Sequence, residues 1–256
     1  MSLNGLDIVT SNHACVTLAH VFSNLPHLRR LDLGGNRTKD RLETILSVLS
    51  QGLEFLGLCG CTVTENDLRY LQRSHHASTL QELDLSSNTL HALRMHEVLI
   101  LLSLLTSSLT VLELEHCHIT ADGLTRLNAV LPNLKCLQYL NLKNNSSLNT
   151  CLTQLTVRSL VEVRTFRMLK MSLPADVVAT EDVGEPSETV GAAFRLALQL
   201  HIRRLCLDQS RPPFSVWLIV WPLLNKYMHM FCFCYNAKYC DNIFFYFISW
   251  NKSTQQ

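Results

Sequence analysis

A nine-residue frame, Leu-x-x-Leu-x-Leu-x-x-Asn/Cys, recurs five times in this sequence, and each copy keeps all four of its defining residues. The copies open at Leu28, Leu53, Leu80, Leu109 and Leu137, so successive starts lie 25, 27, 29 and 28 residues apart. Repeats of this period are supersecondary units that bury their apolar faces only against their neighbours. The chain is therefore expected to fold as a stack of repeats.

Each frame has a direct physical interpretation. The leucines at positions 1, 4 and 6 are expected to point inward from a short strand, while the ninth residue hydrogen-bonds backbone groups of the loop that follows. That ninth residue alternates between amide and thiol, in the order Asn36, Cys61, Asn88, Cys117, Asn145. Between the strands, apolar residues recur at helical spacing, as in 42–49 and 124–134. The sequence predicts an α/β leucine-rich repeat solenoid, a horseshoe with parallel strands on its concave face and helices on its convex face.

Three weaker copies flank the five frames. They start at Leu3, Phe166 and Ile202, and the last of them continues through Leu205 and Leu207. With them, the solenoid is expected to hold about eight strands and to span residues 1–213. Residues 175–190 carry five acidic residues and no Lys or Arg, so we expect an acidic, solvated loop there.

Residues 214–256 differ in composition from the repeats. They hold 13 of the 19 aromatic residues of the chain, together with Cys232, Cys234 and Cys240. Pro222 and several polar residues interrupt the apolar runs, which argues against a membrane span. The cysteines lack the paired spacing of a zinc ribbon. We therefore expect an aberrant, unstructured tail whose removal leaves the repeats intact.

The overall composition limits the possible partners and compartments. The formal net charge is +1, which disfavours a nucleic-acid partner because such a partner requires a basic surface. The sequence near Met1 has no apolar run of the kind that a secretory signal needs. Seven cysteines scattered before residue 211 are expected to be reduced thiols, which indicates a cytoplasmic or nuclear protein without a membrane partner.

No motif in the sequence supports catalysis. His116, Cys117 and His118 could form a metal or nucleophile cluster, but the ninth position of the frame commits Cys117 to the loop. His75 and His76 are expected to lie in a polar turn. The sequence has no phosphate-binding glycine loop, nucleophile elbow or paired CxxC motif. We therefore expect no enzymatic activity, no catalytic residues, no cofactor and no metal.

The binding surface of such a solenoid is expected at positions 3, 5 and 7 of each frame, which alternate with the leucines and line the concave face. Two adjacent strands place four carboxylates there, with no opposite charge expected among them: Glu82, Asp84, Glu113 and Glu115. Three side chains beside them are candidate apolar anchors: Phe55, Val111 and Tyr139. These residues predict a docking site for a basic segment of a protein partner. The alternative is an ordinary solvated sheet face.

Four segments carry a resemblance to a known family. The frames LRRLDLGGN and LQELDLSSN, the stretch SLTVLELEHCHIT, and FRMLKMSLPAD at 166–176 resemble the PRAME family, and within it the leucine-rich repeat-containing protein 14 branch. The order of frames, LPAD segment and acidic stretch carries this similarity, which covers about residues 1–217. The alternation of Asn and Cys at the ninth position also resembles the ribonuclease-inhibitor-like class of these repeats, and that resemblance implies a helix on the convex side of every repeat.

The resemblance also implies a function. Members of the family are adaptors, among them substrate receptors of cullin-type ubiquitin ligases and regulators of immune signalling or transcription. Their elongin- and cullin-contacting helices precede the repeats, whereas this sequence begins at the repeats and matches the C-terminal half only. We therefore expect a protein–protein interaction scaffold or adaptor that binds its partner on the concave face, as the substrate-recognition half of a cullin-type ubiquitin ligase receptor or as a signalling regulator. The missing N-terminal half argues against direct cullin or elongin contact by this polypeptide. The alternative is a truncated isoform or gene-model fragment with no activity of its own.

Overall fold

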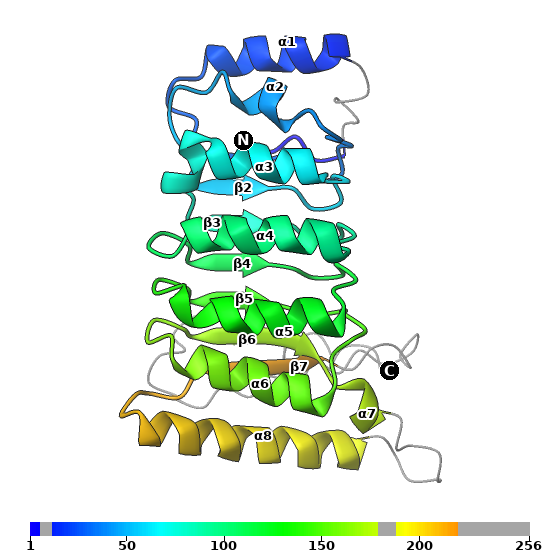
Figure 1. Ribbon diagram of the computed structural model, residues 1–256, viewed down its shortest axis with the longest axis vertical. Helices are drawn as coiled ribbons and strands as arrows, with labels where there is room; N and C mark the ends of the chain where they lie inside the picture. Colours follow the sequence, from blue (N-terminus) through cyan, green and yellow to red (C-terminus); the bar gives the residue numbers. More distant parts are fainter. Residues whose placement is uncertain (6–11, 179–187, 220–256) are drawn as a thin grey trace, which may run out of the picture.

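The computed structural model describes residues 1–5, 12–178 and 188–219, and it arranges the repeats in one parallel sheet (Figure 1). The seven strands follow one another in chain order. They are β1 Arg30–Asp32, β2 Phe55–Gly57, β3 Glu82–Asp84, β4 Val111–Glu113, β5 Tyr139–Asn141, β6 Met168–Ser172 and β7 Ser215–Ile219. Equal frame positions lie side by side, since Leu83 pairs with Leu56 on one flank and with Leu112 on the other.

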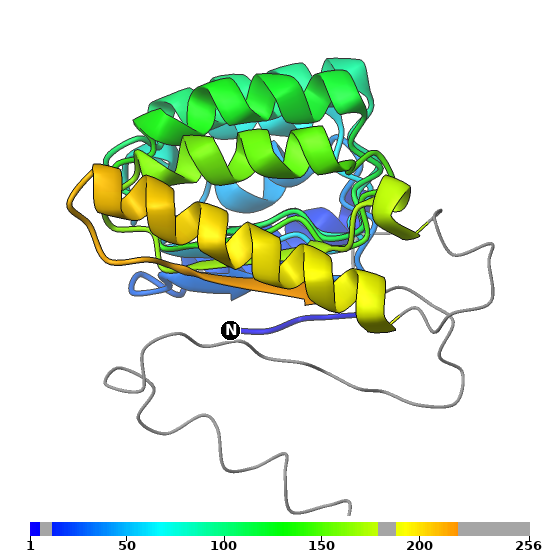
Figure 2. The same ribbon diagram turned by 90° about the horizontal axis from the view of Figure 1, so that it is seen from below.

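The helices form a second layer on one side of this sheet, as Figure 2 shows. They are α1 Asn12–Ser23, α2 Leu42–Leu46, α3 Glu65–Arg73, α4 Ala92–Leu104, α5 Ala121–Val130, α6 Thr150–Val161, α7 Ala175–Val178 and α8 Glu188–Asp208, with short 3-10 turns η1 His75–Ser78 and η2 Leu131–Asn133. The predicted α/β class, with parallel strands and a helical layer, is confirmed. We call the opposite side of the sheet, which carries frame positions 3, 5 and 7, the open face.

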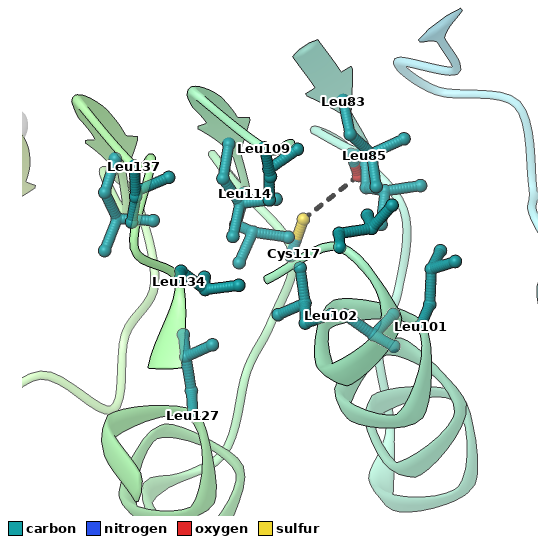
Figure 3. Packing of buried hydrophobic residues seen from close by; sticks show 14 of the residues in the cluster. Leu83, Leu85, Leu101, Leu102, Leu109, Leu114, Cys117, Leu127, Leu134 and Leu137 are labelled. Carbon is teal, nitrogen blue, oxygen red and sulfur yellow. Dashed lines mark hydrogen bonds between the residues drawn. The ribbon is translucent and has the colours of Figure 1, made fainter. Parts of the chain in front are cut away.

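The core lies between the two layers, where the inward leucines of the frames pack against apolar side chains of the helices (Figure 3). Leu83 and Leu112, at the fourth position of consecutive frames, are 1% and 0% exposed. Burying a leucine side chain completely stabilises a fold by roughly 1.5–3 kcal/mol. Repetition of this burial along the chain holds the stack together, since each leucine packs against the repeats on either side.

The ninth residue of each frame ties its own loop to the preceding strand. Asn88 Nδ2 donates to the carbonyl of Leu58 at 2.8 Å and to that of Leu85 at 2.9 Å. Cys117 Sγ donates to the same Leu85 carbonyl at 3.2 Å (Figure 3). Burial raises the pKa of Cys117 to about 12, so its thiol stays protonated at neutral pH. The structural role predicted for Cys117 is confirmed.

The predicted register of the first weak frame is wrong. The Leu3 N–H donates to the Asp32 carbonyl at 2.8 Å, as the Leu33 N–H donates to the Gly57 carbonyl at 2.8 Å. Leu3 therefore occupies the sixth position of its frame rather than the first. Among residues 1–5, Ser2 alone forms a bridge with β1, opposite Asp32. Residues 6–11, which the prediction also assigned to this frame, lie outside the described part of the chain.

The strand predicted at Ile202–Leu207 is also wrong, because these residues lie within α8. Ile202 and Cys206 are buried one helical turn apart, whereas Leu207 is 77% exposed, so the apolar spacing follows the helical period rather than the strand period. The last strand is instead β7, in which Val216 pairs with Leu169 of β6. The sheet thus continues beyond residue 213, and the five residues from 215 to 219 belong to it.

The predicted acidic loop at 175–190 is wrong at both of its ends. Residues 175–178 form α7, and residues 188–190 open α8. Acidic residues are compatible with both positions, because negative charge near a helix N-terminus is favoured by the helix dipole. The middle of the segment, 179–187, and the predicted unstructured part of the tail, 220–256, lie outside the described residues.

A buried arginine fastens the last repeat to the one before it. Arg211 Nη1 donates to the carbonyls of Leu160, Val161 and Val163 at 3.1, 2.7 and 2.7 Å, and Nη2 donates to Phe166 at 3.0 Å. These carbonyls close the C-terminal end of α6 and the turn into β6. The carbonyls of Leu160 and Val163 also accept the backbone N–H groups of Val163 and Phe166, so the guanidinium supplies the missing donor chiefly to Val161, at the end of the helix, and to Phe166.

Candidate functional site

The open face places six of the seven predicted partner-binding residues in two rows that run across the strands, and the seventh, Glu115, lies just beyond β4. Row 3 contains Arg30, Phe55, Glu82, Val111 and Tyr139, each paired with its neighbour in the sheet. Row 5 contains Asp32, Gly57, Asp84, Glu113, Asn141, Lys170 and Trp217 in the same way. All seven predicted residues are half-buried. The sheet therefore brings them to one surface, as the register requires.

Glu82 does not contribute a free negative charge to that surface. Arg30 reaches across β2 and makes two hydrogen bonds to the Glu82 carboxylate, at 2.9 and 2.7 Å. The guanidinium lies over the Phe55 ring, 4.7 Å from its centroid. The expectation that no opposite charge faces the four carboxylates is therefore wrong, and Phe55 is covered by a cation rather than presented as a bare apolar anchor.

The other three carboxylates surround a hollow of about 480 Å³ on the open face, which we call the acidic hollow. Asp84 of β3, Glu113 of β4 and Glu115 just beyond β4 line it together with Tyr139 of β5. Glu82, Phe55 and Val111 do not line it. The structure therefore brings four of the seven predicted residues together and leaves these three outside. The acidic hollow lies over β3, β4 and β5.

Asn141 holds two of these carboxylates in place. Its Nδ2 donates to Glu113 Oε2 at 2.7 Å and to Glu115 Oε2 at 3.0 Å. Its Oδ1 accepts the backbone N–H of Lys143 at 3.0 Å, which fixes the orientation of the amide. Asn141 is only 5% exposed, so its amide is enclosed by the surrounding side chains. The geometry of the hollow is therefore set before any partner arrives.

The surroundings of Glu113 in the acidic hollow disfavour its charged form. Burial raises its pKa, and the nearby charge of Asp84 acts in the same direction, while the amide of Asn141 opposes both. Burial, the charge of Glu113 and a hydrogen bond to that carboxylate raise the pKa of Tyr139, so the hydroxyl stays protonated and donates to Glu113. A cation entering the hollow would favour the ionised form of Glu113.

Two lysines border the acidic hollow. Lys143 Nζ lies 3.2 Å from Glu115 Oε1. Lys170 lines the hollow from β6, and its Nζ lies 5.3 Å from the centroid of the Tyr139 ring and 5.8 Å from that of Trp217. Asp84 makes a different contact, since its Oδ1 accepts the backbone N–H of Ser86 at 2.8 Å. Lys143 pairs with Glu115, and the charge of Lys170 lowers the pKa of Glu113, so the lysines act mainly on the side of the hollow opposite Asp84.

Sequence reasoning did not select several side chains that complete the acidic hollow. They are Cys59, Ser86, Ser87, His116, Asn141, Asn144 and Lys170. Asn141 and Lys170 occupy position 5 of the fifth and sixth frames, so extending row 5 by two strands would have found both of them. His116 adopts a positive φ of 55° in the loop after β4, a conformation that the frame does not encode.

The histidines and cysteines of the described residues do not form a second site. In the ranges 1–5, 12–178 and 188–219, no group of three His, Cys, Asp or Glu side chains is arranged to hold a metal ion. His116 and His118 stack edge to face, with ring centroids 4.9 Å apart, on either side of the buried Cys117. No helix within those ranges is both long and apolar enough to cross a bilayer.

The parallel sheet, the helical layer and the inward ninth residue together define a leucine-rich repeat protein. Comparison with protein families gives a more specific result, because the model of the PRAME C-terminal domain matches residues 4–216. The chain belongs to the PRAME family. The names of this family and of the relatives described next do not describe enzymes.

The chain is similar to curated proteins named leucine-rich repeat-containing protein 14. It is 37% identical to that of Bos taurus over 118 residues, which are 46% of this chain and 24% of the relative. It is 31% identical to that of Xenopus laevis over 160 residues, 62% of this chain and 31% of the relative. PRAME family member 20 of Homo sapiens is 31% identical over 93 residues, 36% of this chain and 19% of that protein. The chain thus spans less than a third of each.

Proposed function

We propose that this chain is a protein-binding repeat domain whose open face receives a basic side chain of its partner in the acidic hollow. The observation that carries the proposal is the convergence of Asp84, Glu113 and Glu115 from neighbouring strands around one hollow of about 480 Å³. A lysine or arginine side chain would match these carboxylates in charge. Asn141 supports the proposal further, because it holds two of them in a fixed geometry.

The finer role that we infer is that of an adaptor. The PRAME resemblance suggests the substrate-recognition part of a cullin-type ubiquitin ligase receptor, or a regulator of signalling, in the cytoplasm or nucleus. In either role, the repeats would supply the surface that selects the partner. No catalysis and no bound cofactor enters this proposal.

The proposal can be tested with an array of peptides that vary in lysine and arginine content, probed with the full chain. The double variant Asp84→Asn with Glu113→Gln removes two charges from the acidic hollow while preserving shape. We expect it to lose most binding to the basic peptides that the unmodified chain selects. Binding of the unmodified chain should also weaken as salt increases, because screening acts on charge-guided association.

A matched control removes two charges elsewhere. Glu43 of α2 and Glu162 after α6 are both exposed in the helical layer, so Glu43→Gln with Glu162→Gln should bind as the unmodified chain does. Equal losses in the two double variants would mean that overall charge, rather than the hollow, drives binding. Failure of the unmodified chain to select any peptide would favour the alternative of a fragment without binding activity of its own.

The anchor residue is tested by kinetics. Tyr139→Phe removes the hydroxyl that hydrogen-bonds Glu113, and Tyr139→Ala also removes the ring. If the ring packs on the aliphatic part of the bound side chain, Tyr139→Ala should shorten the lifetime of the complex much more than Tyr139→Phe. Identical dissociation rates for the two variants would place the partner away from Tyr139.

A further inference from the structure

The acidic hollow has a cation at one end. Lys170 of β6 lines it together with Asp84 and Glu113. Strand pairing sets the order along row 5, which runs from Asp84 through Glu113 and Asn141 to Lys170. Neighbouring strands lie about 4.8 Å apart, so Lys170 stands roughly 14 Å from Asp84 along the row. The hollow therefore has an acidic end over β3 and β4 and a basic end over β6.

The ammonium group of Lys170 is available to a partner. None of the ion pairs within residues 1–5, 12–178 and 188–219 involves Lys170, whereas Lys143 is paired with Glu115. The Lys170 Nζ lies 5.3 Å from the centroid of the Tyr139 ring and 5.8 Å from that of the Trp217 ring. Two aromatic rings hold the cation in place, yet its N–H donors can still make stronger, charge-assisted hydrogen bonds to a carboxylate.

The middle of row 5 carries no charge. Asn141 separates the two ends, and both of its polar atoms are engaged within the chain. Its Nδ2 donates to Glu113 and Glu115, and its Oδ1 accepts the backbone N–H of Lys143. Recognition of charge along this row is therefore confined to its two ends, which have opposite signs.

We propose that the partner segment carries two charged side chains, a basic one for the acidic end and a carboxylate, four residues away in an extended chain, for Lys170. The inference rests on the proposed function and specifies the partner of the same hollow. Four residues of extended chain span about 14 Å, as three strand spacings do, and they bring both side chains to one face of the segment. A spacing of three residues would turn one of the two side chains away from the sheet.

Fluorescence anisotropy with the full chain and synthetic peptides tests the proposal. One peptide carries a single arginine and a glutamate four residues away, with threonine spacers that favour an extended chain. A second peptide has glutamine in place of the glutamate, and a third has the glutamate three residues from the arginine. Each peptide is made in both sequence orders. In one of the two orders, we expect the first peptide to bind about two- to fivefold more tightly than the other two, the range expected for a solvent-exposed ion pair.

Two lysine variants assign the effect to its residue. Lys170→Met removes the charge but keeps a long side chain beside the rings, so it should abolish the preference for glutamate over glutamine. Lys135→Met removes an exposed lysine that does not line the hollow, and it should keep the preference.

The possible failures are distinguishable. If the unmodified chain binds the glutamate and glutamine peptides equally in both orders, the inference is overturned while the proposed function stands. A preference that persists in Lys170→Met would also overturn it, because another group would then bind the carboxylate. If none of the peptides binds, the proposed function fails and this inference fails with it.

Discussion

Acidification should destabilise this protein through one buried imidazole, that of His76. The side chain is 0% exposed and is held by two backbone contacts: its Nδ1 accepts the Leu53 N–H at 3.2 Å, and its Nε2 lies 3.3 Å from the Leu46 carbonyl. The neutral ring satisfies both contacts when Nε2 carries the proton. A second proton would have to displace the Leu53 donor and would leave a buried charge. Burial accordingly lowers the pKa of His76 from 6.5 to about 4.

The sign and size of the effect follow from proton linkage. Because the pKa is lower in the folded than in the unfolded protein, the unfolded protein binds more protons between pH 6.5 and about 4. The contribution of the neutral His76 side chain to the free energy of unfolding is therefore fully present above pH 6.5 and is lost as the pH falls towards about 4. The full difference corresponds to about 3 kcal/mol, of which about 2 kcal/mol is lost by pH 5.

Urea unfolding of the full chain at about pH 7.5 and pH 5 measures this loss. In His76→Gln, the amide can still donate and accept hydrogen bonds but cannot titrate, so we expect a loss smaller by about 2 kcal/mol over the same interval. His27→Gln changes an exposed histidine and should keep the pH dependence of the unmodified chain. If His76→Gln loses as much stability as the unmodified protein does, the imidazole is not the sensitive group.

Two further predictions concern the stability of the stack, and chemical unfolding measures both. Leu83→Ala should lower the free energy of unfolding by about 2–5 kcal/mol because it leaves a cavity at a buried site. Gln81→Ala, two residues away and exposed, should change that free energy by less than about 0.5 kcal/mol. Equal effects of the two substitutions would contradict the register. Arg211→Ala should lower the free energy of unfolding by about 2–6 kcal/mol, because it leaves the buried carbonyls of Val161 and Phe166 without a donor. Arg211→Lys should recover only part of that loss. Full recovery would mean that the positive charge matters more than the planar guanidinium with its several N–H donors.

The interior repeats could be predicted from sequence because their contacts are local and repeated. The spacing of Leu80, Leu83 and Leu85 alone fixes which side chains point inward, and the strand register places the next frame beside them. The frame also predicted the inward thiol of Cys117. Every such residue meets the same surroundings as its counterpart one repeat away, so a pattern found once applies throughout the stack.

The same pattern was less informative at the ends and at isolated contacts. Leu3 fits two positions of the frame, and only its backbone hydrogen bond to Asp32 selects the sixth. Apolar residues near Ile202 satisfy a strand frame and a helical face equally well, and the helix forms because it packs against α6. His76 was expected in a polar turn, yet it is buried because it satisfies backbone groups of the preceding repeat. Nothing in the local sequence of Arg211 signals partners 45–51 residues away.

The candidate site shows how long side chains change a surface that the strand register alone defines. The register correctly placed Glu82 beside Phe55 on the open face, but Arg30 spans the intervening strand and neutralises Glu82. Such a contact joins strands that are not neighbours, so reasoning from adjacent strands about 4.8 Å apart overlooks it. Once Glu82 is paired, the carboxylates that line the hollow are Asp84, Glu113 and Glu115, and burial already raises the pKa of Glu113. A basic side chain entering there would meet carboxylates that are fixed in position and poorly solvated, which is the condition under which charge pairing strengthens most.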